Sequence, residues 1–195
     1  MHIDQETLIL DAAYHCISRD GYAHTSLRHI AKEAGVVLSQ ISYHYQSKEG
    51  LLLAVVARAA NKYQNYMAQN FEPKMTSKEK GERFIAMFQE VLEKDPGVFR
   101  VIYDLAGLAM WSEPLRKKVQ EVFAEMIDGI REIFDTKELQ ETKPDFSAEA
   151  LSIGFSGGLF GIAIQSLLQP ERKEICDSLK TLAIIFGEST EIQQK

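Results

Sequence analysis

The sequence predicts an all-helical fold, and three observations support that prediction. Apolar residues recur at helical spacing through most of the 195-residue chain. The alternation of apolar and polar residues that marks half-buried strands is missing, and only five prolines interrupt the pattern. Hydrophobic residues make up 45% of the chain and charged residues 26%, which is ordinary for a globular protein with a buried core. We therefore expect about nine helices.

The N-terminal quarter contains two short helices joined by a turn. In residues 26–34, apolar side chains follow the i, i+3, i+4, i+7 spacing of one buried helix face. Thr25 or Ser26 can cap this helix, and Gly35 can end it in the left-handed conformation. A second helix over residues 38–45 leaves hydroxyl, amide and aromatic groups outside. This layout is typical of a helix-turn-helix motif that binds DNA.

The helices before and after this motif complete the predicted architecture. A first helix over residues 4–20 should support the motif and complete a three-helix headpiece. The remaining helices are expected over residues 48–70, 77–94, 98–111, from Ser112 to a charged loop at 135–145, over 147–168 and over 171–186. The long helix from residue 48 joins the headpiece to a helical body. We accordingly expect a DNA-binding domain at 1–47 and an effector-binding and dimerisation domain at 48–195.

Short sequence elements in the first quarter stand in a recognisable order and spacing. They are Ile-Leu-Asp-Ala-Ala at 9–13, Gly21-Tyr22, Thr25, Ile30-Ala31, Ala34-Gly35-Val36, Ile41, Tyr43-His44-Tyr45, Ser47-Lys48-Glu49 and Leu51-Leu52. Together they resemble the tetracycline-repressor (TetR) family of bacterial transcriptional regulators. Three residues depart from the family pattern: Val37 replaces a capping Ser or Thr, Ser39 replaces Gly, and Gly50 replaces a capping acid.

The resemblance implies a set of residues at a double-stranded DNA operator. They are Thr25, Ser39, Gln40, Ser42, Tyr43, His44 and Lys48, and we expect Arg28 and Leu38 to lie at the DNA with them. Gln40 is our first choice for reading bases, because its amide can pair with adenine through two hydrogen bonds. Tyr43 and His44 are expected to contact phosphates, which set register without reading sequence. The alternative is an ordinary helical hairpin whose outward side chains are only solvated.

The charge balance of the headpiece argues against a strongly basic DNA footprint. The chain has a net charge of −6, and its first fifty residues hold four Lys or Arg against six Asp or Glu. Most DNA-binding domains are basic. We therefore expect this headpiece to depend on helix N-termini, hydroxyl groups and a few placed cations.

The body is rich in aromatic and methionine side chains, which form either a plain core or an apolar effector pocket. The family resemblance favours a pocket for a small apolar effector. Its expected lining is Phe84, Met87, Phe88, Val91, Ile102, Tyr103, Trp111, Phe123, Met126 and Phe155. Arg100 and Asp104 are four residues apart and should form an ion pair on one helix.

Residues 150–168 carry no charge and contain four glycines on one helical face. Glycine inside a helix costs about 1 kcal/mol relative to alanine, so close packing should offset that cost. The resemblance implies a homodimer, and the interface is expected to include Gly154, Gly157, Gly158, Gly161 and Gln165. A membrane span is the alternative for this segment. Its polar residues argue against that, and we expect no membrane.

The sequence contains no catalytic or cofactor motif. Histidine is confined to the first 44 residues, so the body lacks the commonest general base, and we expect no enzyme activity and no cofactor. His24, His29 and Cys16 could together bind a metal ion, but packing or DNA-side roles are expected, with no metal site. The polar N-terminus predicts a cytoplasmic protein. We expect a ligand-responsive repressor; the alternatives are a DNA-binding regulator without an effector and a membrane-associated helical protein.

Overall fold

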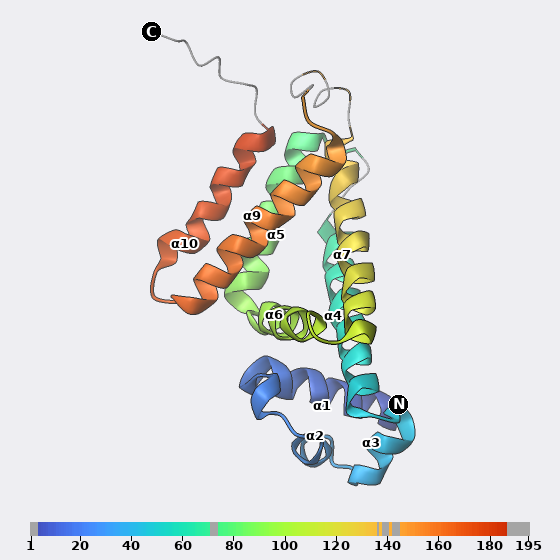
Figure 1. Cartoon of the computed structure of the whole chain (residues 1–195). Coiled ribbons are helices and arrows are strands. Elements are labelled where there is room, and N and C mark those ends of the chain that lie inside the picture. The colour runs from blue at the N-terminus through green and yellow to red at the C-terminus, as the bar shows by residue number, and fades with distance from the viewer. Residues whose placement is uncertain (1–3, 71–73, 136, 138–140, 142–144, 187–195) are drawn as a thin grey trace. The chain divides into compact units, whose positions relative to one another are not determined.

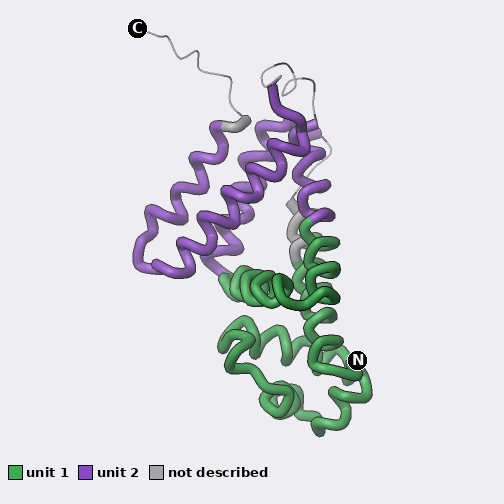
Figure 2. The backbone as a smooth tube through the Cα atoms, viewed as in Figure 1, with its two compact units in different colours: residues 1–65, 95–123 green, residues 66–94, 124–195 purple. Residues whose placement is uncertain are grey.

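The structure, a computed structural model, describes residues 4–70, 74–135, 137, 141 and 145–186. Over these residues the elements are helices without strands, which confirms the all-helical prediction (Figure 1). The chain divides into two compact units, residues 1–65 with 95–123 and residues 66–94 with 124–195 (Figure 2). The two units are defined by compactness and do not divide the chain after residue 47. The expected division into a DNA-binding domain and an effector-binding domain stays a prediction.

The first unit begins with the predicted headpiece. It comprises α1 (Gln5–Asp20), the 3₁₀ turn η1 (Tyr22–His24), α2 (Leu27–Ala34) and α3 (Leu38–Tyr45). The first part of α4 (Lys48–Asn70), α6 (Gly97–Ala109) and the start of α7 (Glu113–Phe134) complete the unit. Its core is made of almost inaccessible aliphatic side chains, among them Ile9, Ile17, Ile41, Leu51 and Val55.

The predicted helix ends of the headpiece are confirmed. The Ser26 hydroxyl accepts the His29 backbone N–H at 3.1 Å and caps α2. Gly35 ends α2 in the left-handed conformation with φ at 67°. The Ser47 hydroxyl accepts the Gly50 backbone N–H at 3.0 Å, so it satisfies one first-turn donor of α4.

The corner between α3 and α4 explains why residue 50 is glycine. Gln46 has a φ of 60° and a ψ of −40°, and the Ser47 N–H donates to the Tyr45 carbonyl at 2.6 Å. This tight turn brings α4 back against the end of α3. A Cβ atom on Gly50 would lie 2.2 Å from the Tyr45 carbonyl oxygen. The departure at residue 50 is therefore a packing requirement of this corner.

Helix α6 packs along α1 within the first unit. A Cβ on Gly97 would lie 3.0 Å from the Ser18 side chain, and the Asp104 carboxylate accepts the Tyr22 backbone N–H at 2.8 Å. The predicted Arg100–Asp104 ion pair is wrong, because it does not form among the described residues and Asp104 instead faces the headpiece.

The second unit is built from α5 (Ser77–Lys94), the rest of α7, α9 (Ala148–Leu168), α10 (Lys173–Asp177) and the 3₁₀ segment η2 (Ser178–Phe186). Aromatic rings join its helices, with ring centroids 5.8 Å apart for Phe84–Phe155 and 5.6 Å for Phe134–Phe155. The single helix expected over 171–186 changes type at Ser178. The charged loop expected at 135–145 lies largely outside the described residues.

Candidate nucleic-acid interface

Helix α3 buries one face and presents the other. Ile41 and Tyr45, four residues apart, are 1% and 8% exposed and attach α3 to the core of the first unit. Ser39 and Ser42 are exposed on the other faces of the helix, and the Tyr43 side chain is 82% exposed. An aromatic side chain exposed to that extent adds little to the stability of the fold, so it is available to bind a partner.

Tyr45 fixes the orientation of α3. Its hydroxyl donates to the Glu6 backbone carbonyl of α1 at 2.8 Å, across 39 residues of sequence. Burial raises the pKa of Tyr45 to about 12, with smaller contributions from the negative charges of Glu6, Asp4 and Asp11. The hydroxyl therefore stays protonated and keeps its hydrogen bond at neutral pH.

Lys48 and Thr25 connect the ends of the headpiece helices. The Lys48 ammonium lies 4.1 Å from the centroid of the Tyr22 ring and 3.3 Å from the Thr25 carbonyl oxygen, to which it donates. The Thr25 side chain is 4% exposed, and its hydroxyl donates to the Gly21 carbonyl at 2.8 Å. The Thr25 hydroxyl is therefore engaged within the turn, and the predicted contact of Thr25 with the operator stays a prediction.

The remaining predicted DNA contacts are spread over α2 and α3. Arg28 on α2 is exposed, Leu38 is 39% exposed, and Gln40 and His44 are half-buried. The His44 ring packs edge-to-face on the Tyr43 ring with centroids 5.1 Å apart. None of these positions contradicts a role at DNA, and each such role stays a prediction.

The acidic residues of the headpiece are largely engaged away from α3. Arg19 donates to Asp20 at 2.9 Å and approaches Glu33 at 3.5 Å, and Arg58 pairs with Asp11 at 2.6 Å. The hydrogen bond from Arg19 lowers the pKa of the Asp20 carboxyl. Helix α3 itself contains no acid. A weakly charged headpiece can therefore still present a face that does not repel phosphate.

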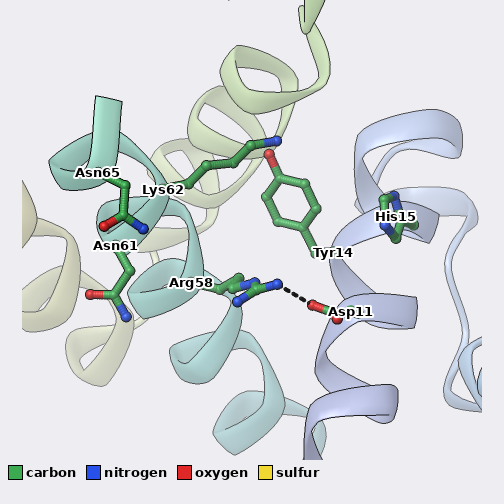
Figure 3. Close-up of a pocket in the computed structure, with 7 residues that line it drawn as sticks. All are labelled: Asp11, Tyr14, His15, Arg58, Asn61, Lys62 and Asn65. Carbon is green, nitrogen blue, oxygen red and sulfur yellow. Dashed lines mark ion pairs between the residues drawn. The ribbon is translucent and has the colours of Figure 1, made fainter. Parts of the chain in front are cut away.

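A pocket of about 250 Å³ lies between α1 and α4 in the first unit (Figure 3). Its lining is polar and comprises Asp11, Tyr14, His15, Arg58, Asn61, Lys62 and Asn65. The Asp11–Arg58 ion pair crosses it, and the Lys62 ammonium lies 5.2 Å from the Tyr14 ring centroid and also pairs with Asp95. Sequence reasoning missed this pocket, because no motif links residues 11 and 58.

The residues predicted for an effector pocket fall in both units. In the second unit, Phe84, Met87, Phe88, Val91, Met126 and Phe155 are all buried. In the first unit, Ile102, Tyr103 and Phe123 are half-buried. The Trp111 side chain is 90% exposed at the turn between α6 and α7, so the first unit alone does not enclose it.

The predicted dimer residues of α9 do not share one environment. A Cβ on Gly158 would lie 3.0 Å from the Leu182 side chain of η2, so this glycine packs against η2 of the same chain. A Cβ on Gly154, Gly157 or Gly161 would have no neighbour within 4 Å. Ile153, Ile164 and Leu168 are 51%, 40% and 73% exposed. We call these three residues with Gly154 and Gly157 the exposed α9 face.

Helix α9 is also long and apolar enough to cross a membrane, by length and composition alone. Only 28% of its most apolar window is buried inside the described structure. The exposed α9 face is therefore accessible to solvent within the described structure.

Helix α2, the turn at Gly35 and helix α3 form a helix-turn-helix, which is the layout of a DNA-binding motif. Residues 9–55 match the family described as "Bacterial regulatory proteins, tetR family". This match covers the N-terminal quarter of the chain and agrees with the resemblance that the sequence predicted. The "Fatty acid metabolism regulator protein" of Bacillus subtilis (strain 168) is 28% identical over 125 residues, 63% of each chain. The match thus spans less than two thirds of that relative.

Solved structures share the fold. The fatty acid degradation regulator FadR from Bacillus halodurans has a TM-score of 0.78 with 18% identity, over 100% of both chains. FadR from Bacillus subtilis, solved in complex with stearoyl-CoA, has a TM-score of 0.77 with 20% identity, over 92% of this chain and 96% of that one. At these identities the structural likeness concerns the fold alone.

Proposed function

We propose that the chain is a transcriptional repressor that binds a near-palindromic operator as a homodimer and is released by a long-chain acyl-CoA. The observation that carries the DNA-binding part is the outward face of α3. This face presents serine hydroxyls and the 82% exposed Tyr43, while the opposite face of the helix is buried in the core of the first unit. The helix contains no acidic residue. Such a helix can enter the major groove, where its side chains reach base edges and phosphates.

The acyl-CoA part rests on the relatives and on the chemistry of the second unit. One relative is named for fatty acid metabolism, and one structural neighbour holds stearoyl-CoA. An acyl chain needs an apolar lining, and the second unit supplies one in Phe84, Phe88 and Phe155. The Phe88 and Phe160 rings add an edge-to-face contact at 5.9 Å.

One observation favours a regulator without an effector. The Phe84, Phe134 and Phe155 side chains are at most 1% exposed, and the Phe84 and Phe134 rings each contact the Phe155 ring. An acyl chain must then part this cluster or bind beside it. Effector titration distinguishes the two functions.

The homodimer rests on the exposed α9 face. A second copy would remove Ile153, Ile164 and Leu168 from water, and each buried Å² of apolar surface contributes about 25 cal/mol. We therefore propose a cytoplasmic dimer and not a membrane span. Ile164→Glu should yield monomers in sedimentation at micromolar concentration, whereas Gly158→Ala should leave the dimer intact. A dimeric Ile164→Glu protein would place the interface elsewhere.

Displacement from DNA tests the effector. Operator duplexes selected from randomised DNA are titrated with stearoyl-CoA, free CoA and stearate, each below its micelle-forming concentration. Stearoyl-CoA should weaken DNA binding, whereas free CoA should not. If none of the three changes the affinity of a sequence-specific complex, the chain is a regulator without an acyl-CoA effector.

A matched pair of variants locates the acyl chain. Phe88→Ala should reduce the response to stearoyl-CoA, whereas Trp111→Ala, which removes an exposed ring, should respond as the unsubstituted protein does. An unaltered response in Phe88→Ala would exclude the second unit's aromatic cluster as the acyl site.

A further inference from the structure

Three potential metal ligands meet between α1 and α2, and a fourth lies near one of them. The donor atoms of Cys16, His29 and Glu33 all lie within 4.8 Å of one another. The nearest Asp20 oxygen lies 3.9 Å from His29 Nε2. Cys16 and Asp20 are four residues apart on α1, and His29 and Glu33 are four residues apart on α2. Because residues at that spacing share a helix face, two facing helices present two donors each.

The hydrogen-bonding of the Cys16 and His29 donor atoms favours the binding of a cation. The Cys16 side chain is completely buried, and its thiol makes no hydrogen bond within the described part of the chain. The His29 Nε2 atom lies 3.4 Å from an Arg19 nitrogen. Since a guanidinium can only donate, Nε2 accepts at this contact and its lone pair faces the Arg19 nitrogen, the position that an incoming cation would take.

The Arg19 guanidinium occupies the position next to the donors that a metal ion would take. Its guanidinium contacts Asp20, Glu33 and His29 at 2.9, 3.5 and 3.4 Å, so it neutralises the same acids that a metal ion would. The Arg19 side chain is 53% exposed and can turn outward into water without leaving a buried charge. Its contacts with the donors are therefore exchangeable.

We propose that Cys16, His29 and Glu33, with Asp20 as fourth donor, form a binding site for a thiophilic divalent cation such as Zn²⁺, which exchanges with the Arg19 side chain. Sulfur, imidazole and carboxylate are the ligands that Zn²⁺ accepts in tetrahedral sites, at about 2.0 to 2.3 Å. Ligand atoms then lie about 3.5 Å apart, so the donors need to move inward by about 1 Å. On binding, the Cys16 thiol releases its proton to solvent and the thiolate binds the metal.

Such a site would join α1 to α2 inside the headpiece. Binding to the folded state alone would stabilise it in proportion to the free metal concentration. The site is independent of the proposed acyl-CoA response, because its donors all lie in α1 and α2.

Cobalt titration of the full chain is the test, because thiolate-bound Co²⁺ gives a charge-transfer band in the near ultraviolet. We expect the reduced, chelator-treated protein to develop this band with one equivalent of Co²⁺, to lose it on addition of Zn²⁺, and to unfold at a higher temperature with either metal. Cys16→Ala and His29→Gln should abolish the band, and Glu33→Gln should weaken Co²⁺ binding. Arg19→Gln should strengthen it, because the competing cation is gone.

Two control variants are available in the chain. Cys176→Ala and His24→Gln remove the other cysteine and a neighbouring histidine outside the cluster, and both should keep the band. Circular dichroism shows which variants are folded, and His29→Gln and Glu33→Gln alter residues that are partly solvent-exposed. Absence of the band at excess Co²⁺, or its persistence in folded His29→Gln, would overturn the proposal.

Discussion

The Asp104 carboxylate on α6 accepts the backbone N–H of Tyr22 at 2.8 Å, across 82 residues of sequence. This contact joins α6 to the turn that precedes the helix-turn-helix. Asp104→Ala leaves a part-buried N–H without its acceptor, and we expect a loss of about 1 to 3 kcal/mol in the free energy of unfolding. Urea denaturation measures it. Asp104→Asn keeps an acceptor oxygen and should lose less; equal stability of Asp104→Ala and the unsubstituted protein would show that the contact contributes nothing.

Gly50 should tolerate no side chain. A Cβ there would lie 2.2 Å from the Tyr45 carbonyl oxygen, so Gly50→Ala must move the start of α4 away from α3. We expect a lower unfolding temperature and weaker DNA binding. Gly107→Ala on α6 is the matched control: its Cβ meets nothing within 4 Å, and alanine should stabilise the helix by about 0.5 to 1 kcal/mol. A Gly50→Ala protein as stable as Gly107→Ala would contradict the described corner.

Helix α3 lacks a side-chain cap, and supplying one should stabilise the protein. Val37 stands at the N-cap with extended backbone angles and is 64% exposed, so its replacement removes little buried surface. Val37→Ser should add about 0.5 to 1 kcal/mol to the free energy of unfolding, because its hydroxyl can accept a first-turn N–H. Thermal denaturation is the measurement, with Val37→Ala as the control that lacks the hydroxyl. No difference between the Ser and Ala variants would show that the cap does not form.

Tyr45 predicts a loss of stability at alkaline pH. Its pKa is raised to about 12 in the folded state, against about 10 in an unfolded chain. Below pH 10 both states are protonated and the contribution is complete. Between about pH 10 and 12 only the unfolded state ionises, so stability falls as pH rises. Tyr45→Phe should show a shallower decline over this window in urea titrations; a decline of the same slope would assign the effect to other groups.

The headpiece was predictable because its signals are local. Helical spacing, Ser26, Gly35 and Ser47 determine where α2 and α4 begin or end, and each is decided within four residues of sequence. The outward face of α3 was also predictable, because burial of Ile41 and Tyr45 on one face determines which residues of the helix point outward. Val37 and Gly50 were visible as departures from the family, but the corner that requires Gly50 was not.

The sequence did not predict contacts between residues that lie far apart along the chain. Asp104 was expected to pair within α6, whereas its partner is 82 residues away. Gly158 lies on the same helical stripe as Gly154 and Gly157, and only the position of Leu182 separates them. The Thr25 side chain is buried and the Trp111 side chain is exposed, and neither state follows from the residue type alone. Spacing along one helix does not determine which face meets another helix.

Selection of bound duplexes from randomised DNA tests the central claim most directly. We expect an enriched motif with two-fold symmetry, whose half-sites repeat at about 10 base pairs or a multiple of that distance. Tyr43→Ala should bind this motif weakly, whereas Trp111→Ala, which removes an equally exposed ring from the α6–α7 turn, should bind it as the unsubstituted protein does. Enrichment of no motif, or equal affinity of Tyr43→Ala and Trp111→Ala for it, would contradict the assignment of α3 as the DNA-reading helix.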